Sequence, residues 1–341
     1  MIGKNDSDSG VLAMRNLITD IEGLKVGNVD DDQLRSGVTV LLPDEPCIAA
    51  VDVRGGGPGT RDTEALGLLG SVDHVHAVVL SGGSAFGLGA ATGVQSYLRQ
   101  RGIGFEIGNA RVPIVPQAIL FDLLNGGDKN WGDTPPYEAM ARRACELAEV
   151  SFELGSKGAG LGATTARFKG GLGSASAVCN GATIGALAAV NPVGCATIPG
   201  TTQFWAAPFE IDGEFGDLGM PDSFGPQHHV PMLKGGAQEN TTLCVVATDA
   251  ALDKRQAQRL AIMAQTGLAL AVRPVHTPLD GDIVFALSTG ARELSDPLFD
   301  LARLGACAAQ TLARAIARGV YEAGSCDPNW SEPRHIRAII Q

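Results

Sequence analysis

The chain has 341 residues, of which 45% are hydrophobic and 5% aromatic, and its formal net charge is -11. This composition excludes a disordered chain and is enough for a large core, which the scarce aromatic residues leave to Ala, Val, Leu and Gly. The acidic balance argues against nucleic acid and anionic membranes as partners, because both need a basic surface to neutralise phosphates.

The ends and the cysteines indicate a cytoplasmic protein. The first ten residues are polar, without a basic or apolar segment typical of a signal peptide, and no apolar run is long enough to span a bilayer. We expect residues 1–15 to be flexible. The seven cysteines are scattered without a Cys-x-x-Cys pair and read as buried, reduced thiols: Cys47, Cys145, Cys179, Cys195, Cys244, Cys307 and Cys326.

Short apolar runs punctuated by glycine predict strands in the first part of the chain. They cover residues 18–27, 37–42, 47–53 and 75–80. None alternates cleanly between apolar and polar residues, so we expect these strands to be covered on both faces.

A glycine-rich turn at residues 81–87 follows the last of these strands and leads into a predicted helix that ends near Arg99. Such a turn can direct the N–H groups of Gly82, Gly83 and Ser84 at an anion or oxyanion, or it can simply let the helix pack close to the sheet. It is not a nucleophile elbow, because Phe86 stands where glycine is required, and Ser84 breaks a dinucleotide fingerprint.

Residues 112–123 are predicted to be extended, residues 125–136 a loop and residues 137–150 a helix. The glycine-rich segment 155–173 contains a loose Gly-x-Gly-x-x-Ala match, but no acidic residue lies between Glu153 and Glu210, which argues against a nicotinamide site. Lys157, Arg167 and Lys169 either create a local positive field there or lie at strand ends in solvent.

Residues 174–178 and 182–190 are predicted strands, and Asn191 follows the second of them. An Asn at this place serves either a turn or an oxyanion hole. Residues 199–231 have no periodicity and read as a long irregular excursion. The adjacent His228 and His229 lack further spaced ligands, so no metal or other cofactor is expected.

The step from Asn240 to Thr241 marks the change from a polar, glycine-rich segment to an apolar strand at residues 242–248. A cut at this bond would give Thr241 both a hydroxyl nucleophile and an amine that can accept its proton. By itself, however, an Asn-Thr step is usually an ordinary loop-to-strand junction. A helix at 253–271, a strand at 283–288 and a helix at 297–318 follow, so sheets covered by helices are expected.

Asp280 and Asp282 flank Gly281 shortly before the last predicted strand. The Asp-Gly pair is foremost a hairpin signal. Alternatively, two carboxylates two residues apart in an extended segment point to one face and can orient an ammonium group.

Several segments, in order from about Asn16 to about Glu322, together resemble the L-aminopeptidase/D-esterase family of self-processing N-terminal-nucleophile hydrolases, which includes β-peptidyl aminopeptidases and nylon-oligomer hydrolases. The matching segments are residues 18–27, 51–56, 80–88, 169–176, 191–194, 240–242 and 276–286.

The resemblance implies an α/β (α+β) fold, a four-layer αββα sandwich with two sheets between helix layers, formed by residues 16–322 and followed by a tail at 323–341. It also implies self-cleavage into an α chain (1–240) and a β chain (241–341), with αβ units that assemble into homotetramers.

The resemblance further assigns roles to matched positions. Thr241 corresponds to the nucleophile released after Asn240, Asn191 to an oxyanion donor, and Lys169, Asp280 and Asp282 to the surrounding polar network. The turn at Gly82, Gly83 and Ser84 is similar to one that lines the substrate site. Two departures are visible: many relatives have Ser at the nucleophile, and some have a Tyr where this chain has Phe121, which offers no side-chain donor.

This chemistry predicts an amidase or aminopeptidase that hydrolyses small peptides or amides through an acyl-Thr241 ester, with the freed amine as base. The branched Thr side chain suits this role, because its restricted χ1 holds the hydroxyl near the amine. Two alternatives remain open: an acyltransferase with the same nucleophile, similar to ornithine acetyltransferases, and a non-enzymatic small-molecule binding protein.

Overall fold

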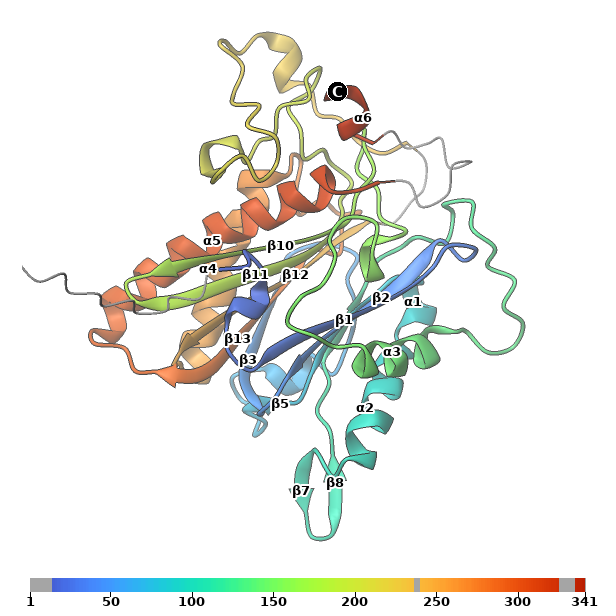
Figure 1. Cartoon of the computed structure of the whole chain (residues 1–341), viewed down its shortest axis with the longest axis vertical. Coiled ribbons are helices and arrows are strands. Elements are labelled where there is room, and N and C mark those ends of the chain that lie inside the picture. Colours follow the sequence, from blue (N-terminus) through green and yellow to red (C-terminus); the bar gives the residue numbers. More distant parts are fainter. Residues whose placement is uncertain (1–13, 236–239, 325–334, 341) are drawn as a thin grey trace, which may run out of the picture.

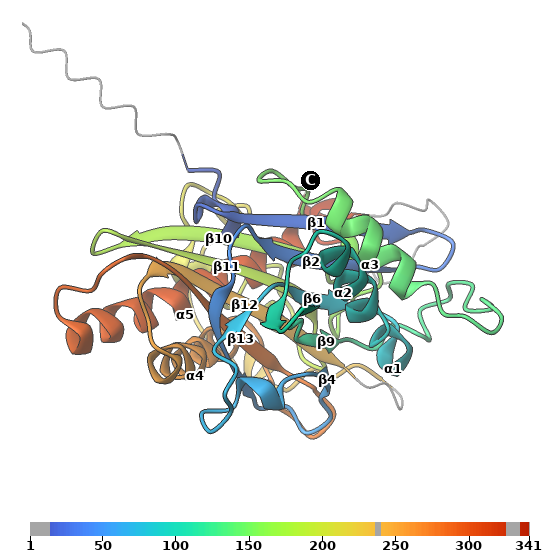
Figure 2. The same ribbon diagram turned by 90° about the horizontal axis from the view of Figure 1, so that it is seen from below.

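The computed structural model describes residues 14–235, 240–324 and 335–340. Two large sheets dominate the fold, and helices cover the outer face of each (Figures 1 and 2). The first sheet has the order β1-β2-β6-β9-β4 and the second β10-β11-β12-β13-β3-β5. A separate hairpin, β7-β8, projects from the body.

The strands of the first sheet are β1 (Leu24–Asp31), β2 (Ser36–Pro43), β4 (Gly59–Arg61), β6 (Val78–Ser81) and β9 (Gln117–Ile119). Those of the second are β3 (Cys47–Val53), β5 (His74–Val75), β10 (Leu172–Cys179), β11 (Ala182–Asn191), β12 (Thr241–Ala250) and β13 (Ile283–Arg292). The hairpin consists of β7 (Phe105–Ile107) and β8 (Ala110–Val112). The helices are α1 (Ser84–Gly87), α2 (Ala90–Gln100), α3 (Tyr137–Glu146), α4 (Lys254–Ala271), α5 (Pro297–Tyr321) and α6 (Arg337–Ile340).

The strands are apolar on both faces because they serve two cores at once. In β12, Cys244 and Val246 pack toward α4 and α5, whereas Leu243, Val245 and Ala247 pack toward the other sheet. Since successive side chains of a strand point to opposite faces, this pattern requires a covered strand. A third core joins the first sheet to α2 and α3. The expected αββα sandwich is confirmed.

Helix starts in the second half of the chain follow local capping. Asp253 accepts a hydrogen bond from the N–H of Gln256 at the start of α4, and Asp296 accepts one from the N–H of Phe299 at the start of α5, where Pro297 is the first helical residue. An Asp side chain before a helix accepts hydrogen bonds from the free N–H groups of the first turn, and Pro is favoured as the first helical residue. Both helices therefore begin within a residue of their predicted positions.

The first predicted strand is wrong at its beginning. Residues 18–20 form a 3-10 turn, and β1 starts at Leu24 after Gly23, whose φ of 85° favours glycine. The N–H of Ile18 donates to the Ser174 hydroxyl at 2.8 Å instead of joining a strand ladder. The helix predicted at residues 137–150 is shorter in the structure, where α3 ends at Glu146.

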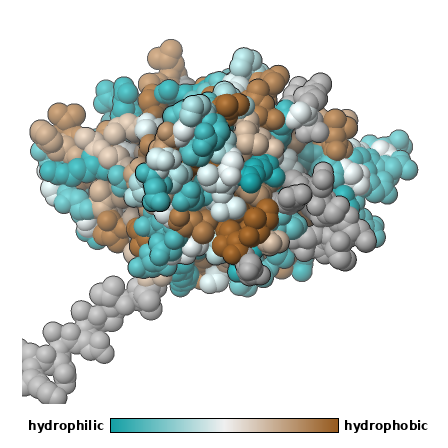
Figure 3. Space-filling model, turned by 90° about the horizontal axis from the view of Figure 1, so that it is seen from above, coloured by the Kyte–Doolittle hydropathy of each residue, from teal (hydrophilic) through white to brown (hydrophobic). Residues whose placement is uncertain are grey.

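The excursion at residues 199–231 is irregular as predicted, with only two 3-10 turns, at Ala207–Phe209 and Pro226–His229. Phe204 and Phe215 anchor it with ring centroids 5.4 Å apart in an edge-to-face contact. Figure 3 shows the molecule from above, and hydrophobic and hydrophilic residues are mixed on this face.

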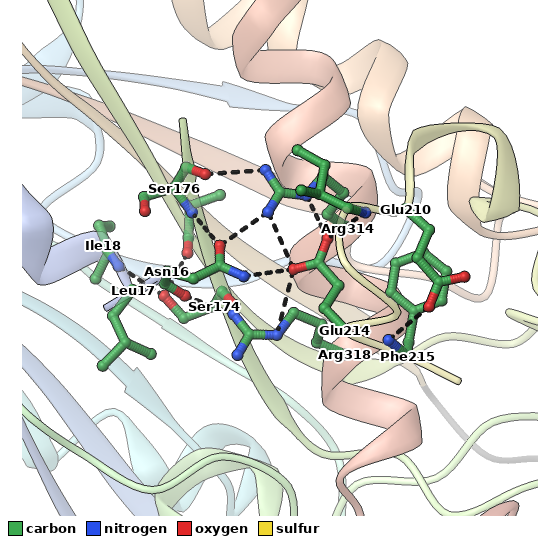
Figure 4. A network of polar contacts seen from close by, with 12 residues as sticks. Asn16, Leu17, Ile18, Ser174, Ser176, Glu210, Glu214, Phe215, Arg314 and Arg318 are labelled. Carbon is green, nitrogen blue, oxygen red and sulfur yellow. Dashed lines mark hydrogen bonds and ion pairs between the residues drawn. The ribbon is translucent and has the colours of Figure 1, made fainter. Parts of the chain in front are cut away.

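A buried ion-pair network ties the excursion to the rest of the fold (Figure 4). Glu214 receives hydrogen bonds from Arg314, and its Oε2 lies 3.6 Å from the Nε of Arg318. Arg314 also donates to the Asn16 side chain at 2.9 Å and to the carbonyl of Ser176 at 2.9 Å. Because Arg314 and Glu214 are almost fully buried, each needs the other to offset its desolvation.

Six cysteines lie in the described residues and all are free thiols, four buried and two half-buried. Cys326 lies outside the described residues, as do residues 1–13 of the predicted flexible start and much of the predicted tail. Among the described helices, none combines the length and the apolar character needed to cross a bilayer.

Candidate active site

The topology of the second sheet brings the predicted site residues to one end of it. Strand β11 ends at Asn191 and runs antiparallel to β12, which begins at Thr241, so these two residues are register partners. Strand β13 runs parallel to β12 and begins at Ile283, just after Asp280 and Asp282. The three segments therefore meet at the sheet end where β12 starts.

Two hydrogen-bond donors lie on the carbonyl oxygen of the bond between Asn240 and Thr241. The Thr241 hydroxyl donates to the carbonyl oxygen of Asn240 at 2.5 Å. The N–H of Gly281 donates to the same carbonyl oxygen at 2.8 Å. Both residues are buried, at 2% and 3% exposure.

Gly281 is a site residue that sequence reasoning did not single out. Its N–H lies on the carbonyl oxygen that would become negative during attack, which is the position of an oxyanion donor. A Cβ at this position would lie 2.6 Å from the Thr241 hydroxyl oxygen, closer than real contacts allow. The sequence signal was present in the Asp-Gly-Asp motif, but it indicated a hairpin or carboxylate chemistry. In the structure, the backbone of Asp280 forms a parallel bridge with Asn240.

Asp282 fixes the start of β12. One of its carboxylate oxygens accepts the N–H of Thr242 at 3.0 Å, and the other accepts the N–H of His276 at 2.9 Å. The Nδ1 of His276 lies 3.1 Å from that second oxygen, and His276 has a φ of 56°, in the left-handed region. Through these contacts the fully buried carboxylate holds Thr242, the residue next to Thr241. His276 is a further contact that the sequence reasoning did not assign.

Asp280 links the same end of the sheet to the segment after β11. It accepts the N–H of Val193 at 2.9 Å and the hydroxyl of Thr277 at 2.7 Å. Burial raises the pKa of the Asp280 carboxyl, and the neighbouring Asp282 raises it further. The two carboxylates thus lie close to each other and near Thr241, and both accept backbone N–H groups; that they orient an ammonium group stays a prediction.

The side chain of Asn191 is oriented by three contacts. Its Oδ1 accepts the N–H of Thr164 at 3.0 Å and the ammonium of Lys234 at 2.9 Å, and its Nδ2 donates to the carbonyl of Phe121 at 3.1 Å. An amide nitrogen carries two hydrogens, so one remains for an oxyanion. Phe121 therefore contributes its main chain to the site, not a side-chain donor.

Lys169 is buried at 1% exposure beside β10. Its ammonium donates to the carbonyls of Gly160, Ala163 and Gly170 at 3.2, 2.7 and 3.0 Å. These contacts hold the glycine-rich segment in a compact arrangement. Thr164, whose N–H donates to Asn191, lies next to one of the three carbonyls, that of Ala163. A direct part for Lys169 in the reaction stays a prediction.

The N–H groups of the glycine turn after β6 are used inside the protein, which corresponds to the close-packing alternative for this turn. The N–H of Gly82 donates to the carbonyl of Gly37, that of Gly83 to the carboxylate of Asp122, and that of Ser84 to the carbonyl of Leu120. All three donors are consumed by the close packing of the turn. That the turn lines the substrate site stays a prediction.

Asp122 beneath this turn supports a prediction on pH and stability. The carboxylate is buried, Gly83 donates to its Oδ1, and its Oδ2 has no hydrogen-bond partner among the described residues. Burial raises the pKa of the Asp122 carboxyl, and Lys129 partly offsets this. A raised pKa means that the native state binds the proton more readily than the unfolded chain, so ionised Asp122 lowers stability as pH rises.

We expect Asp122→Asn to increase the free energy of unfolding at neutral pH by on the order of 1 kcal/mol. The gain should shrink as the pH falls through the raised pKa, because wild-type Asp122 is then protonated as well. Denaturant unfolding of both proteins from neutral to acidic pH measures it. A pH-independent difference would contradict the assignment.

Within the described ranges, no group of three or more His, Cys, Asp or Glu side chains is arranged to hold a metal ion. His228 and His229 lie in a 3-10 turn of the excursion, where the Nδ1 of His228 accepts the N–H of Gly225.

The chain is similar to known proteins in sequence. The sequence profile of the family described as Peptidase family S58 matches residues 16–329. An uncharacterized aminopeptidase of Mycobacterium tuberculosis is 41% identical over 330 residues, which cover 90% of this chain and 94% of that protein. A 6-aminohexanoate-oligomer endohydrolase of Agromyces sp. is 27% identical over 287 residues, covering 81% of this chain and 75% of that protein.

A solved structure is similar in fold. The L-aminopeptidase D-Ala-esterase/amidase from Ochrobactrum anthropi, described as a variant of the Ntn hydrolase fold, superposes with a TM-score of 0.66. The match covers 92% of this chain and 88% of that one at 23% identity.

Proposed function

This chain belongs to peptidase family S58, and from that premise we propose that it is an N-terminal-nucleophile aminopeptidase or amidase that activates itself by cutting the bond between Asn240 and Thr241. The observation that carries the proposal is the scissile carbonyl held between the Thr241 hydroxyl and the N–H of Gly281. An ordinary loop-to-strand junction would not require a buried carbonyl with both a nucleophile and an oxyanion donor on it.

Self-cleavage begins with attack of the Thr241 oxygen on the carbonyl carbon of Asn240. The carbonyl oxygen becomes negative and is stabilised by the Gly281 N–H. The C–N bond then breaks, the nitrogen takes up a proton, and the acyl group rests as an ester on Thr241. Water hydrolyses the ester, which leaves a carboxylate on Asn240 and a free amine and hydroxyl on Thr241.

The mature reaction repeats this chemistry on an external amide. The Thr241 amine, whose reference pKa is about 7.7–8.0, accepts the hydroxyl proton near neutral pH. The second N–H of Asn191 is the donor for the new oxyanion, and Asp282 keeps the start of β12 in place through Thr242. Water then releases the acyl group.

Substrates are proposed to be small peptides or amides with an amino group on the acyl part. The relative from M. tuberculosis is named an aminopeptidase, and the Agromyces relative acts on oligomers of 6-aminohexanoate, as its name states. An acyltransferase would use the same nucleophile and is separated by adding an amine acceptor to the assay. A cytoplasmic location and a homotetramer of αβ units complete the proposal; the free thiols support a reducing compartment.

Intact mass spectrometry of freshly purified protein, followed over time, tests the function. We expect fragments of residues 1–240 and 241–341 to appear together with hydrolysis of aminoacyl amides. A full-length chain that hydrolyses amides would overturn self-cleavage. A cut chain that is inactive on every amino-terminal amide of a broad panel would overturn the aminopeptidase assignment.

A further inference from the structure

Lys234 lies on the segment that leads to the proposed cleavage site and is attached to the end of β11. Its ammonium donates to the Oδ1 of Asn191 at 2.9 Å and to the main-chain oxygen of Asn191 at 3.3 Å. Its own N–H donates to the carbonyl of Val193 at 3.0 Å. Side chain and backbone thus bind the same turn, and the side chain reaches the predicted oxyanion donor.

The contact fixes which way the Asn191 amide faces. An ammonium group and a backbone N–H can only donate, so Lys234 and Thr164 together require an acceptor in front of them. A flipped amide would place its NH2 group against two donors. The Nδ2 of Asn191 must therefore point the other way, toward the Phe121 carbonyl. Of the two donors, the ammonium makes the stronger, charge-assisted bond.

The electrostatic surroundings keep Lys234 at this place. Asp280 accepts the N–H of Val193, the residue whose carbonyl receives the N–H of Lys234, so the carboxylate is close. Burial lowers the pKa of Lys234 well below its usual range, while Asp280 acts in the opposite direction and Lys169 adds to the lowering. A buried cation is costly here, and the hydrogen bonds to Asn191 and the negative charge of Asp280 offset part of that cost.

We propose that Lys234 is a positioning residue of the oxyanion site, which holds the Asn191 amide with its N–H2 group toward the reacting carbonyl. This rests on the proposed function, because it assigns Asn191 to the oxyanion. Lys234 acts through Asn191 and does not touch the substrate. Its loss should therefore weaken transition-state stabilisation and leave substrate binding nearly unchanged.

The test compares the self-cleaved Lys234→Met, Lys234→Arg and wild-type enzymes. Direct removal of an oxyanion donor costs about 10²–10³ in kcat, and we expect Lys234→Met to lower kcat by about 10-fold or more with KM unchanged. Lys234→Arg should recover most of the loss, since it keeps a charged donor. Lys25→Met, which removes an exposed lysine paired with Asp44, is the matched control and should behave as wild type.

A double-mutant cycle with Asn191→Ala makes the test specific. If Lys234 acts through Asn191, Lys234→Met should add almost nothing in the Asn191→Ala background. Additive losses, a raised KM with unchanged kcat, or no loss at all would overturn the inference while leaving the proposed function intact. Should Lys234→Met stay uncut, the kcat of the self-cleaved Lys234→Gln enzyme replaces that of Lys234→Met, and a kcat equal to that of wild type would overturn the inference. An uncut, inactive wild type would instead overturn the proposed function.

Discussion

Replacing Thr241 with Ala is expected to leave the chain at full length and without amide hydrolysis. The hydroxyl that lies 2.5 Å from the Asn240 carbonyl oxygen is the only proposed nucleophile for both reactions. Loss of a nucleophile lowers kcat by on the order of 10⁶, so the variant should be indistinguishable from background. Thr241→Ser keeps a hydroxyl and should still be cut, more slowly, because the unbranched side chain is less restricted in χ1.

The neighbouring Thr242 supplies a matched control. Thr242 is also buried at the start of β12, but its hydroxyl has no hydrogen-bond partner among the described residues. Thr242→Val removes this hydroxyl at nearly constant volume and should be cut and active. Intact mass and amide hydrolysis are measured for Thr241→Ala, Thr241→Ser and Thr242→Val, and together they test whether Thr241 is the nucleophile. A Thr241→Ala chain that is cut after Asn240 would contradict the assigned nucleophile.

Gly281→Ala should nearly abolish self-cleavage. A Cβ at residue 281 would lie 2.6 Å from the Thr241 hydroxyl oxygen and 2.7 Å from the carbonyl of Gly57. The nucleophile or the Gly281 N–H must then move, and the loss of one oxyanion donor alone costs about 10²–10³ in rate. The φ of Gly281 is not positive, so the effect arises from space at the site and not from backbone strain.

Gly57→Ala is the matched control, because Gly57 lies beside Gly281 but has space around it for a Cβ atom. Its Cβ would approach the carbonyls of Asp280 and Pro278 only to 3.7 and 3.9 Å, which are ordinary contacts. The rate of self-cleavage should be near that of wild type in Gly57→Ala and lower by at least about 10²-fold in Gly281→Ala. Thermal unfolding of both variants separates a local effect from a folding defect. Equal cleavage rates would remove Gly281 from the site.

Local sequence patterns were sufficient for the layers and for much of the site. The apolar run after Thr241 predicted a strand, and β12 forms it and contributes to both neighbouring cores. The alternatives for Asn191 and Asp280 could not be decided from pattern alone, because a turn signal and a site residue look the same in sequence. The resemblance over nearly the whole chain favoured the site, and the sheet register brings these residues together.

The sequence could not predict contacts made by groups that have no distinctive sequence pattern. The N–H of Gly281 belongs to every non-proline residue, so only the register between the Asn240 and Asp280 segments shows where it points. Lys234 belongs to no motif in the sequence, and its partner Asn191 lies far away in the chain. The first strand was misplaced for a similar reason: the Ser174 hydroxyl, distant in sequence, takes the N–H of Ile18.

The buried pair of Glu214 and Arg314 gains a second meaning once the proposed cut is made. Glu214 then belongs to one polypeptide and Arg314 to the other, and β12 and β13 of the second lie between β11 and β3 of the first. Separating the two polypeptides would break the second sheet in its middle, and it would leave the buried charges of Glu214 and Arg314 without their partners. The severed enzyme therefore persists as a unit, yet its refolding would depend on concentration. In the proposed mechanism, the bond before Thr241 therefore connects the two polypeptides only until the chain has folded.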